Sequence, residues 1–245
     1  MDSPPKLLMG ASALSRISAI DNAVPAQVIG ELRAQIIESH ARRPKCGDAG
    51  TYWYSLDAPA RMLFEQVIQH LRSFVPRGHE FVGAEWWFRA TTTDTGFPFH
   101  FDRDEGIRSS IVSPGLASIL YLSSAGGPTV ILDATPSRIA APSAGIAVYP
   151  RPGRFGMFPG TLLHGVLPGR PGRWPRVTML VNWWRSEPRL ERAPEQLDGT
   201  PASSRWRVAV ERAKTPFAAL ESIDPSRLLA NAAWRDLISK QATYR

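Results

Sequence analysis

The chain of 245 residues is long enough for one sizeable core, and its 43% hydrophobic residues exclude global disorder. No apolar run approaches the roughly 20 residues of a membrane-spanning helix. The formal net charge of +7 comes mainly from arginine without a long basic run, so we interpret it as a solvated surface rather than a nucleic-acid footprint. Cys46 is the single cysteine, which excludes an internal disulfide and favours a cytoplasmic location.

Two segments near the N-terminus have the apolar spacing of amphipathic helices. The first, residues 25–41, begins with Pro25, a residue that suits a first helical turn. The second, residues 59–74, carries an apolar stripe made of Met62, Leu63, Val67, Leu71 and Phe74. We therefore expect residues 1–79 to form an N-terminal helical part.

The pattern changes to short strands separated by glycine and proline. About eight such strands are predicted, at residues 82–91, 97–102, 117–123, 129–133, 145–149, 156–158, 164–167 and 176–184. This number of short strands is typical of a jelly roll, also called a double-stranded β-helix. A further helix is predicted at residues 226–240, within a C-terminal extension of residues 186–245. The prediction is one domain over 1–245, mainly β, with a jelly-roll core at 80–185 buttressed by helices.

One segment of a predicted strand carries two metal-ligating residues. His100 and Asp102 are two positions apart, so on a strand their side chains point to the same face. A third ligand must come from elsewhere, and His164, in a later predicted strand, is the candidate. Two imidazoles and one carboxylate on one side of a metal form the facial set of oxygen-activating iron(II) enzymes.

A cation and a hydroxyl follow at matching spacing. Arg176 opens the last predicted strand, and Thr178 lies on the same face of it. A guanidinium and a hydroxyl side by side are suited to binding a carboxylate.

These residues, taken together, resemble the 2-oxoglutarate/Fe(II)-dependent dioxygenase superfamily, and within it most closely the prolyl-4-hydroxylase type. The resemblance covers about residues 80–185. Its motifs stand in this order: Phe88-Arg89, Gly96 and His100-x-Asp102, then Leu120-Tyr121-Leu122 and Gly126-Gly127-x-Thr129, then Phe158-Pro159-Gly160 ahead of His164, Arg176-x-Thr178, and Trp183-Trp184.

The resemblance implies a cofactor and a reaction. Fe(II) is held by His100, Asp102 and His164, and 2-oxoglutarate is bound through Arg176 and Thr178. O2 is the further co-substrate, and the products are succinate, CO2 and an oxidised, usually hydroxylated, C–H bond. Tyr121 is a further candidate contact to 2-oxoglutarate.

Two positions depart from the pattern of the prolyl-4-hydroxylase type. Ala90 stands where that type often has tyrosine, and Ser123 stands where it usually has asparagine. Both departures weaken the case for a prolyl substrate.

Candidate substrate contacts lie next to these ligands. The polar segment 103–110 directly follows Asp102 and is predicted to be a loop at the mouth of the jelly roll, with Arg103 and Arg108 available to a polar substrate. Trp86 and Trp87 alternate faces, so one belongs to the core and the other is a candidate pocket wall. Trp87 and Arg89 are therefore further candidate substrate contacts, and residues 51–54 are a possible additional aromatic wall.

Several functions remain open at this point. A small-molecule substrate is favoured, ahead of a peptide or protein side chain. A nucleic-acid demethylase of the same superfamily is less favoured, since position 182 holds Asn182 where a second arginine is usual. A jelly-roll binding module without activity is the remaining alternative. No membrane partner is expected, and the oligomeric state is left open.

Overall fold

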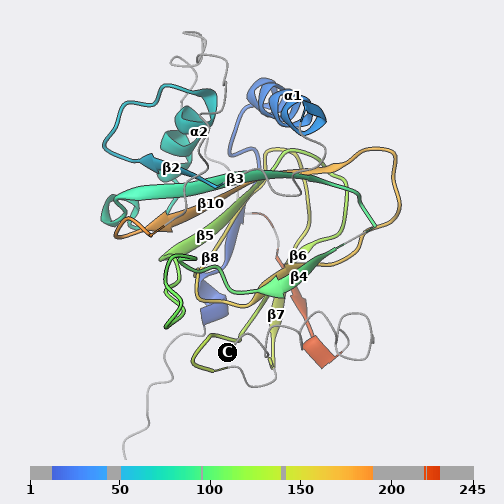
Figure 1. The fold of residues 1–245 in the computed structure, drawn as a ribbon. Helices are drawn as coiled ribbons and strands as arrows, with labels where there is room; N and C mark the ends of the chain where they lie inside the picture. The colour runs from blue at the N-terminus through green and yellow to red at the C-terminus, as the bar shows by residue number, and fades with distance from the viewer. Residues whose placement is uncertain are drawn as a thin grey trace, which may run out of the picture.

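The computed structural model describes residues 13–42, 51–94, 96–138, 142–189, 218 and 220–226. Two antiparallel β-sheets face one another, and two helices cover the outer face of the larger sheet (Figure 1). The helices are α1 (Ala26–Arg42) and α2 (Leu63–Arg72). The described residues also include two short 3-10 helices, η1 (Ala13–Arg16) and η2 (Gly78–Glu80). Among the described residues, no helix is both long enough and apolar enough to cross a membrane.

The larger sheet has six strands in the order β1-β8-β5-β10-β3-β2, and the smaller has five in the order β11-β7-β6-β9-β4. The strands of the larger sheet are β1 (Ser18–Ile20), β2 (Tyr52–Ser55), β3 (Gly83–Thr91), β5 (Leu116–Tyr121), β8 (Phe155–Phe158) and β10 (Arg176–Trp184). Those of the smaller sheet are β4 (Phe97–His100), β6 (Thr129–Leu132), β7 (Gly145–Val148), β9 (His164–Val166) and β11 (Glu221–Ile223).

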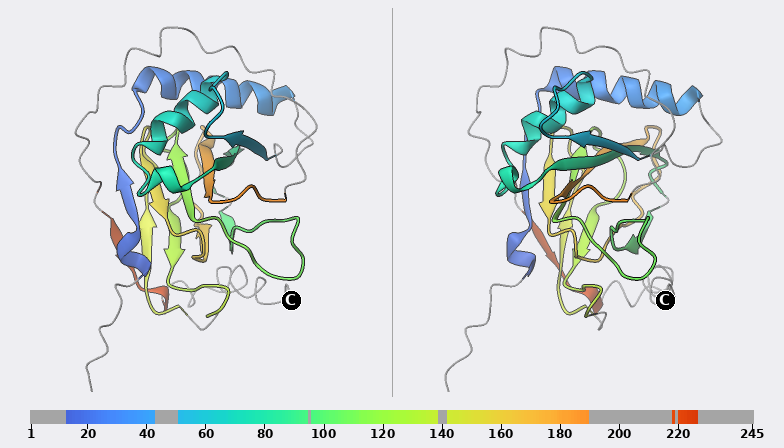
Figure 2. Two further views of the ribbon diagram at one scale, coloured as in Figure 1. Left: turned by 90° about the vertical axis from the view of Figure 1, so that its left-hand side faces the viewer. Right: turned by 60° about the vertical axis from the view of Figure 1, so that its left-hand side comes forward.

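The strand order is that of a double-stranded β-helix. The core strands β3 to β10 pass between the sheets, giving β8-β5-β10-β3 in one sheet and β7-β6-β9-β4 in the other. Strands that follow one another in the chain therefore lie across the sandwich more often than side by side, as Figure 2 shows from two further directions. This topology confirms the predicted jelly-roll core, including all eight of its predicted strands.

The helices form because their apolar faces have a sheet to cover. In α2, the buried residues recur at helical spacing, and Phe64 stacks on Trp86 of β3 with ring centroids 4.9 Å apart. The helix begins at Leu63, later than predicted, where the Glu65 carboxylate accepts a hydrogen bond of 3.0 Å from the backbone N–H of Met62. The second helix is therefore shorter, at Leu63–Arg72, than the predicted range of residues 59–74.

Three short strands were not predicted. The strands β1, β2 and β11 have three or four residues each, too few for a period-2 pattern to stand out, and each pairs with an edge of the core. Residues 52–55 form one of them, and Tyr52 stacks on Trp86 at 4.7 Å, within the core below the helices rather than as a pocket wall. The predicted helix at 226–240 lies outside the described residues apart from its first position.

Candidate active site

The three predicted metal ligands, His100, Asp102 and His164, come together between the sheets. Their candidate ligand atoms all lie within 4.8 Å of one another. One oxygen of Asp102 is 3.5 Å from His100 Nε2, and the other is 3.6 Å from His164 Nε2. The pairing of β4 with β9 sets His100 directly opposite His164, so the sheet itself brings the two imidazoles together. One ion can reach all three side chains.

Hydrogen bonds fix which ring nitrogen of each histidine faces the carboxylate. His100 Nδ1 is 2.9 Å from the carbonyl oxygen of Pro98, and His164 Nδ1 is 3.0 Å from that of Leu162. Because a carbonyl oxygen only accepts hydrogen bonds, each Nδ1 carries the proton and each Nε2 presents a lone pair. Metal-binding histidines have this arrangement, with the second ring nitrogen bonded to an acceptor.

The protonation states also suit a metal. Burial lowers the pKa of His164 to about 4, against the opposing attraction of Asp102. Burial alone would raise the pKa of Asp102, but His164, His100 and Asn182 together hold it below its ordinary value. Neutral imidazole and ionised carboxylate are the forms that bind a divalent metal, so the site is prepared for one at neutral pH.

A buried amide and a buried acid lie behind Asp102. Asn182 of β10 stands opposite Glu85 of β3, and its side-chain amide lowers the pKa of both Glu85 and Asp102. Trp184 Nε1 donates a hydrogen bond of 2.9 Å to Glu85. Burial, with a further contribution from the charge of Asp102, raises the pKa of Glu85 to about 7. Asn182 and Glu85 therefore place a polar amide and a second, buried acid close to the Asp102 carboxylate.

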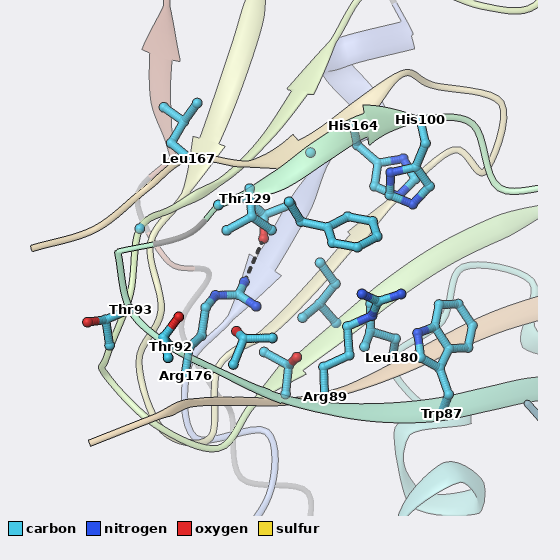
Figure 3. Close-up of a pocket in the computed structure, with 18 residues that line it drawn as sticks. Trp87, Arg89, Thr92, Thr93, His100, Thr129, His164, Leu167, Arg176 and Leu180 are labelled. Atoms are coloured by element: carbon cyan, nitrogen blue, oxygen red, sulfur yellow. Dashed lines mark hydrogen bonds between the residues drawn. The ribbon is translucent and has the colours of Figure 1, made fainter. Parts of the chain in front are cut away.

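A pocket extends from the two histidines to Arg176 (Figure 3). One wall is formed by alternate residues of β3 and β10, whose side chains share the inner face of the larger sheet. The opposite wall comes from β4, β6 and β9 of the smaller sheet. Ile119 and Leu180 make part of the lining apolar, and none of the described lining residues is acidic.

The end of the pocket away from the histidines is built for an anion. Arg176 is 7% exposed, Thr178 is fully buried, and both line the pocket. Arg176 Nη2 donates a hydrogen bond of 3.1 Å to Thr129 Oγ1, whereas Arg176 Nε and Thr178 Oγ1 are buried with no partner in the described structure. Buried donors without acceptors are costly, so this end favours a ligand with acceptor oxygens, and a carboxylate supplies two.

Neighbouring residues give Arg176 its position. Gly126 has φ +86°, and a Cβ there would lie 2.6 Å from Arg176 Cδ, so both the backbone angle and the packing require glycine. The Tyr121 hydroxyl is 2.8 Å from Thr129 Oγ1 and 3.1 Å from the carbonyl of Val148. Tyr121 is not among the described residues that line the pocket, and its hydroxyl lies against Thr129, which does line it. A contact of Tyr121 with the co-substrate stays a prediction.

The donor set fits ferrous iron and 2-oxoglutarate. Two imidazoles and a carboxylate are the facial ligands of non-haem iron(II), which leave further metal positions for small ligands. The unpartnered donors of Arg176 and Thr178 at the other end match the second carboxylate of a short dicarboxylic acid.

The four predicted substrate residues divide into two pairs. Trp87 and Arg89 line the pocket, on the same face of β3. Arg103 and Arg108 lie on the segment after Asp102, which is a loop as predicted, but they are not among the described residues that line the pocket. Arg103 instead pairs with Glu105 at 3.1 Å.

The sequence reasoning missed Glu85 and Asn182. A signal for them existed, because both are polar residues within long runs of buried apolar residues in β3 and β10. Each also lies in period-2 register with a predicted pocket residue, Glu85 with Trp87 and Asn182 with Thr178. Polar residues on the inner face of a core strand are candidates for the site.

Comparison with known proteins gives structural likenesses only. No family model and no curated protein matches the sequence. A prolyl-4-hydroxylase of Pseudomonas putida is 17% identical, covering 70% of this chain and 93% of its own, with a TM-score of 0.49. AviO1 of Streptomyces viridochromogenes is 16% identical, covering 78% and 100%, with a TM-score of 0.47.

A viral collagen prolyl hydroxylase from Paramecium Bursaria Chlorella virus-1, solved with 2-oxoglutarate, is 15% identical over 71% of this chain and 97% of its own, with a TM-score of 0.45. Identities and TM-scores this low indicate nothing about the reaction that the present chain catalyses. Its chemistry is therefore inferred from its own residues. Two of these solved structures are of prolyl hydroxylases, and a further similar one is of a non-haem α-ketoglutarate-dependent carbocyclase, SnoK.

Proposed function

We propose that this chain is an Fe(II)- and 2-oxoglutarate-dependent oxygenase that hydroxylates an unactivated C–H bond of a small molecule. One observation carries the proposal: the two histidines of a His-Asp-His ligand set and an anion site with buried, unpartnered donors line a single pocket. Either feature alone occurs in proteins of several classes, but a metal site and a carboxylate site facing the same space fit a metal-chelating keto acid.

When bound, iron and 2-oxoglutarate supply the oxidising chemistry, in which O2 is consumed, succinate and CO2 are released, and one oxygen atom becomes available to a C–H bond. The chain's own residues bind and orient. His100, Asp102 and His164 are the proposed metal ligands, and the amide of Asn182 helps to keep the carboxylate among them ionised by lowering its pKa.

Arg176 and Thr178 are proposed to bind the distal carboxylate of 2-oxoglutarate. Thr129 holds the guanidinium of Arg176 through a 3.1 Å hydrogen bond, which restricts its direction. The side chains of Ile119 and Leu180 give the pocket an apolar part, which excludes water. Because the guanidinium of Arg176 is already held by Thr129, less entropy is lost when it binds the carboxylate.

The proposal of a small substrate is supported by the shape of the site. The pocket is walled by side chains from both sheets, and its lining includes an aromatic residue, Trp87, and a cation, Arg89. Pockets of this composition are typical of small-molecule sites, in which apolar walls carry a few polar groups.

The test is metal and co-substrate binding under argon. The wild-type protein should bind about one Fe(II) per chain, and added 2-oxoglutarate should produce the weak visible charge-transfer band of a chelated keto acid. His100→Ala, Asp102→Ala and His164→Ala should each lower iron affinity by at least tenfold and abolish the band. His79→Ala, which removes an exposed histidine outside the pocket, is the matched control and should change neither quantity.

Wild-type iron affinity in all three ligand variants would contradict the proposed metal site. Iron binding without a charge-transfer band would contradict the proposed co-substrate.

A further inference from the structure

The surface of the described chain carries an exposed tryptophan outside the proposed active site. Trp174 is 61% exposed, the largest fraction among the exposed large hydrophobic residues that the structure describes. It ends the wholly exposed segment 170–174, two positions before β10. A single exposed apolar side chain is common, so the neighbours of Trp174 decide whether it marks a binding surface.

A groove of about 250 Å³ lies beside Trp174, and its lining comes from three parts of the chain. Ile37 belongs to α1, Ala90 and Thr91 belong to β3, and Trp174 and Pro175 belong to the segment before β10. Ile37 is itself 38% exposed, so the groove presents apolar surface from α1 as well as from the indole. The exposed tryptophan is therefore part of a patch that the fold assembles.

Two guanidiniums lie over the indole of Trp174. The guanidinium carbon of Arg33 is 5.8 Å from the ring centroid, and that of Arg173 is 5.4 Å from it. Arg33 and Ile37 are four residues apart on α1, so this helix offers a cation and an apolar side chain on one face. The fold thus gathers two positive charges from different elements around one ring.

Acidic residues are absent from the described lining of the groove. Glu38 follows Ile37 on α1 but is outside this lining, and it already has an interaction within the protein. Two neighbouring cations repel one another, so an anionic group placed between them relieves the repulsion. The groove therefore favours a ligand that carries negative charge.

The lining also decides between two classes of acidic macromolecule. Nucleic-acid bases bind by stacking on open aromatic faces, whereas two guanidiniums already lie over the Trp174 ring. An apolar groove with arginine and tryptophan at its edge matches the centre of a protein interface, in which these two residue types are enriched. An aliphatic side chain fills such a groove, and carboxylates beside it reach the guanidiniums. A peptide segment with acidic residues around an aliphatic one combines both features.

We propose that the groove beside Trp174 is a docking site for an acidic segment of a partner protein, with an aliphatic side chain in the groove and carboxylates on Arg33 and Arg173. The docking site is independent of the proposed function, because no contact with iron or 2-oxoglutarate enters it. Thr91 and Thr92 line both the groove and the proposed active-site pocket. A docked segment therefore contacts residues that also form a wall of that pocket.

Nuclear magnetic resonance of the full-length protein, labelled with nitrogen-15, tests the docking site with the indole N–H signal of Trp174 as the reporter. That signal is assigned by its disappearance in Trp174→Phe, which keeps an aromatic ring at a largely exposed position. The probe is the blocked peptide Glu-Asp-Leu-Asp-Glu. Its two comparison peptides are Gln-Asn-Leu-Asn-Gln, which has no charge, and Glu-Asp-Gly-Asp-Glu, which has no aliphatic side chain.

The acidic leucine peptide should shift the Trp174 signal and bind at least fivefold more tightly than either comparison peptide, because it alone offers both charge and an aliphatic side chain. Raising the salt concentration from about 0.05 M to about 0.5 M should weaken its binding, since interactions between exposed charges are screened by salt.

Two substitutions separate the charge from the apolar contact. Arg33→Gln should raise the dissociation constant of the acidic leucine peptide at least threefold, and Arg138→Gln is its matched control, since Arg138 is exposed and outside the groove. Ile37→Ala should have an effect of similar size, with Val82→Ala as the control at another exposed aliphatic residue. Both controls should bind the peptide as wild type does.

The docking site is contradicted if the acidic leucine peptide leaves the Trp174 signal in place, or if it binds no more tightly than either comparison peptide. Wild-type binding in either Arg33→Gln or Ile37→Ala contradicts it as well. A single-stranded oligothymidylate that shifts the same signal at a lower concentration than the peptide would assign the groove to nucleic acid instead. None of these results depends on iron or 2-oxoglutarate, so the proposed function stands or falls separately.

Discussion

Adjacent residues of β3 face two different environments. Trp86 is 1% exposed and stacks between Tyr52 and Phe64 under the helices. Trp87 points to the other face of the sheet, into the pocket, where Arg89 is its neighbour. One face of the strand therefore contributes to stability and the other to the site, which means that two tryptophans with the same local sequence context should differ sharply on substitution.

The largest effect is expected on the helix-covered face. Trp86→Ala should lower the free energy of unfolding by about 3–5 kcal/mol, because it removes a fully buried aromatic side chain and leaves a cavity. Trp87→Ala should cost clearly less, since its side chain is only half-buried. Urea denaturation of both variants in the metal-free state measures the difference, and equal losses would contradict the division between the faces.

On the pocket face, the main effect should appear in ligand affinity. Arg176→Ala should raise the dissociation constant of 2-oxoglutarate at least tenfold, since breaking a buried charge pair costs about 2–5 kcal/mol. Thr178→Ala should raise it less, because a hydroxyl bonded to a charged group contributes about 1.5–3 kcal/mol. Titration of the charge-transfer band measures both.

Arg173→Ala is the control for these variants, as Arg173 is exposed and lies three positions before Arg176. If Arg173→Ala weakened 2-oxoglutarate binding and Arg176→Ala did not, the carboxylate would be bound by Arg173, which would contradict the assignment to Arg176.

Glu85 lies on the inner face of the sheet, and its ionisation should make the free energy of unfolding depend on pH. Its pKa is raised to about 7 in the folded protein, from an ordinary value of 4.5. The unfolded chain therefore loses its proton first as pH rises, so the stability that neutral Glu85 contributes is complete below pH 4.5 and is lost by about pH 7. The loss amounts to about 3 kcal/mol.

Glu85→Gln has no such titration. Metal-free wild type should therefore lose stability relative to Glu85→Gln as pH rises from 4.5 to 8, as measured by denaturation in a chelating buffer. A difference between the two proteins that stays constant over this range would show that Glu85 is ionised throughout.

The smallest effect concerns Tyr121, behind the anion site. Tyr121→Phe removes the hydroxyl that contacts Thr129, a loss of about 1 kcal/mol. The dissociation constant of 2-oxoglutarate should rise by about fivefold, with iron affinity unchanged. A loss as large as that of Arg176→Ala would mean that Tyr121 contacts the co-substrate directly, as the sequence alone predicted.

Periodicity predicted the core but not its additions. The strand from Gly83 to Thr91 and the one from Arg176 to Trp184 were predicted nearly to the residue, because long runs of buried residues bounded by glycine or proline are distinctive. The strands β1, β2 and β11 are short and form only because an edge of the core offers them hydrogen bonds. Such pairing depends on tertiary contacts, which local sequence does not contain.

Spacing predicted the ligands but not their supports. His100 and Asp102 were identified from their period-2 spacing, and His164 from its place in a later strand. The contact of Asn182 with Asp102 joins residues 80 positions apart, and no short-range pattern encodes it. The position of Tyr121 behind Thr129 likewise depends on how β5 packs against the smaller sheet.

The central claim is that one pocket holds a metal at His100, Asp102 and His164 and a carboxylate at Arg176. Diffraction from anaerobic crystals grown with Fe(II) and 2-oxoglutarate, recorded at the iron absorption edge, tests it most directly. The account predicts an anomalous peak bound by the Nε2 atoms of both histidines and by Asp102, with the distal carboxylate of 2-oxoglutarate against Arg176 Nε and Thr178 Oγ1. Iron bound elsewhere, or 2-oxoglutarate bound away from Arg176, would contradict it.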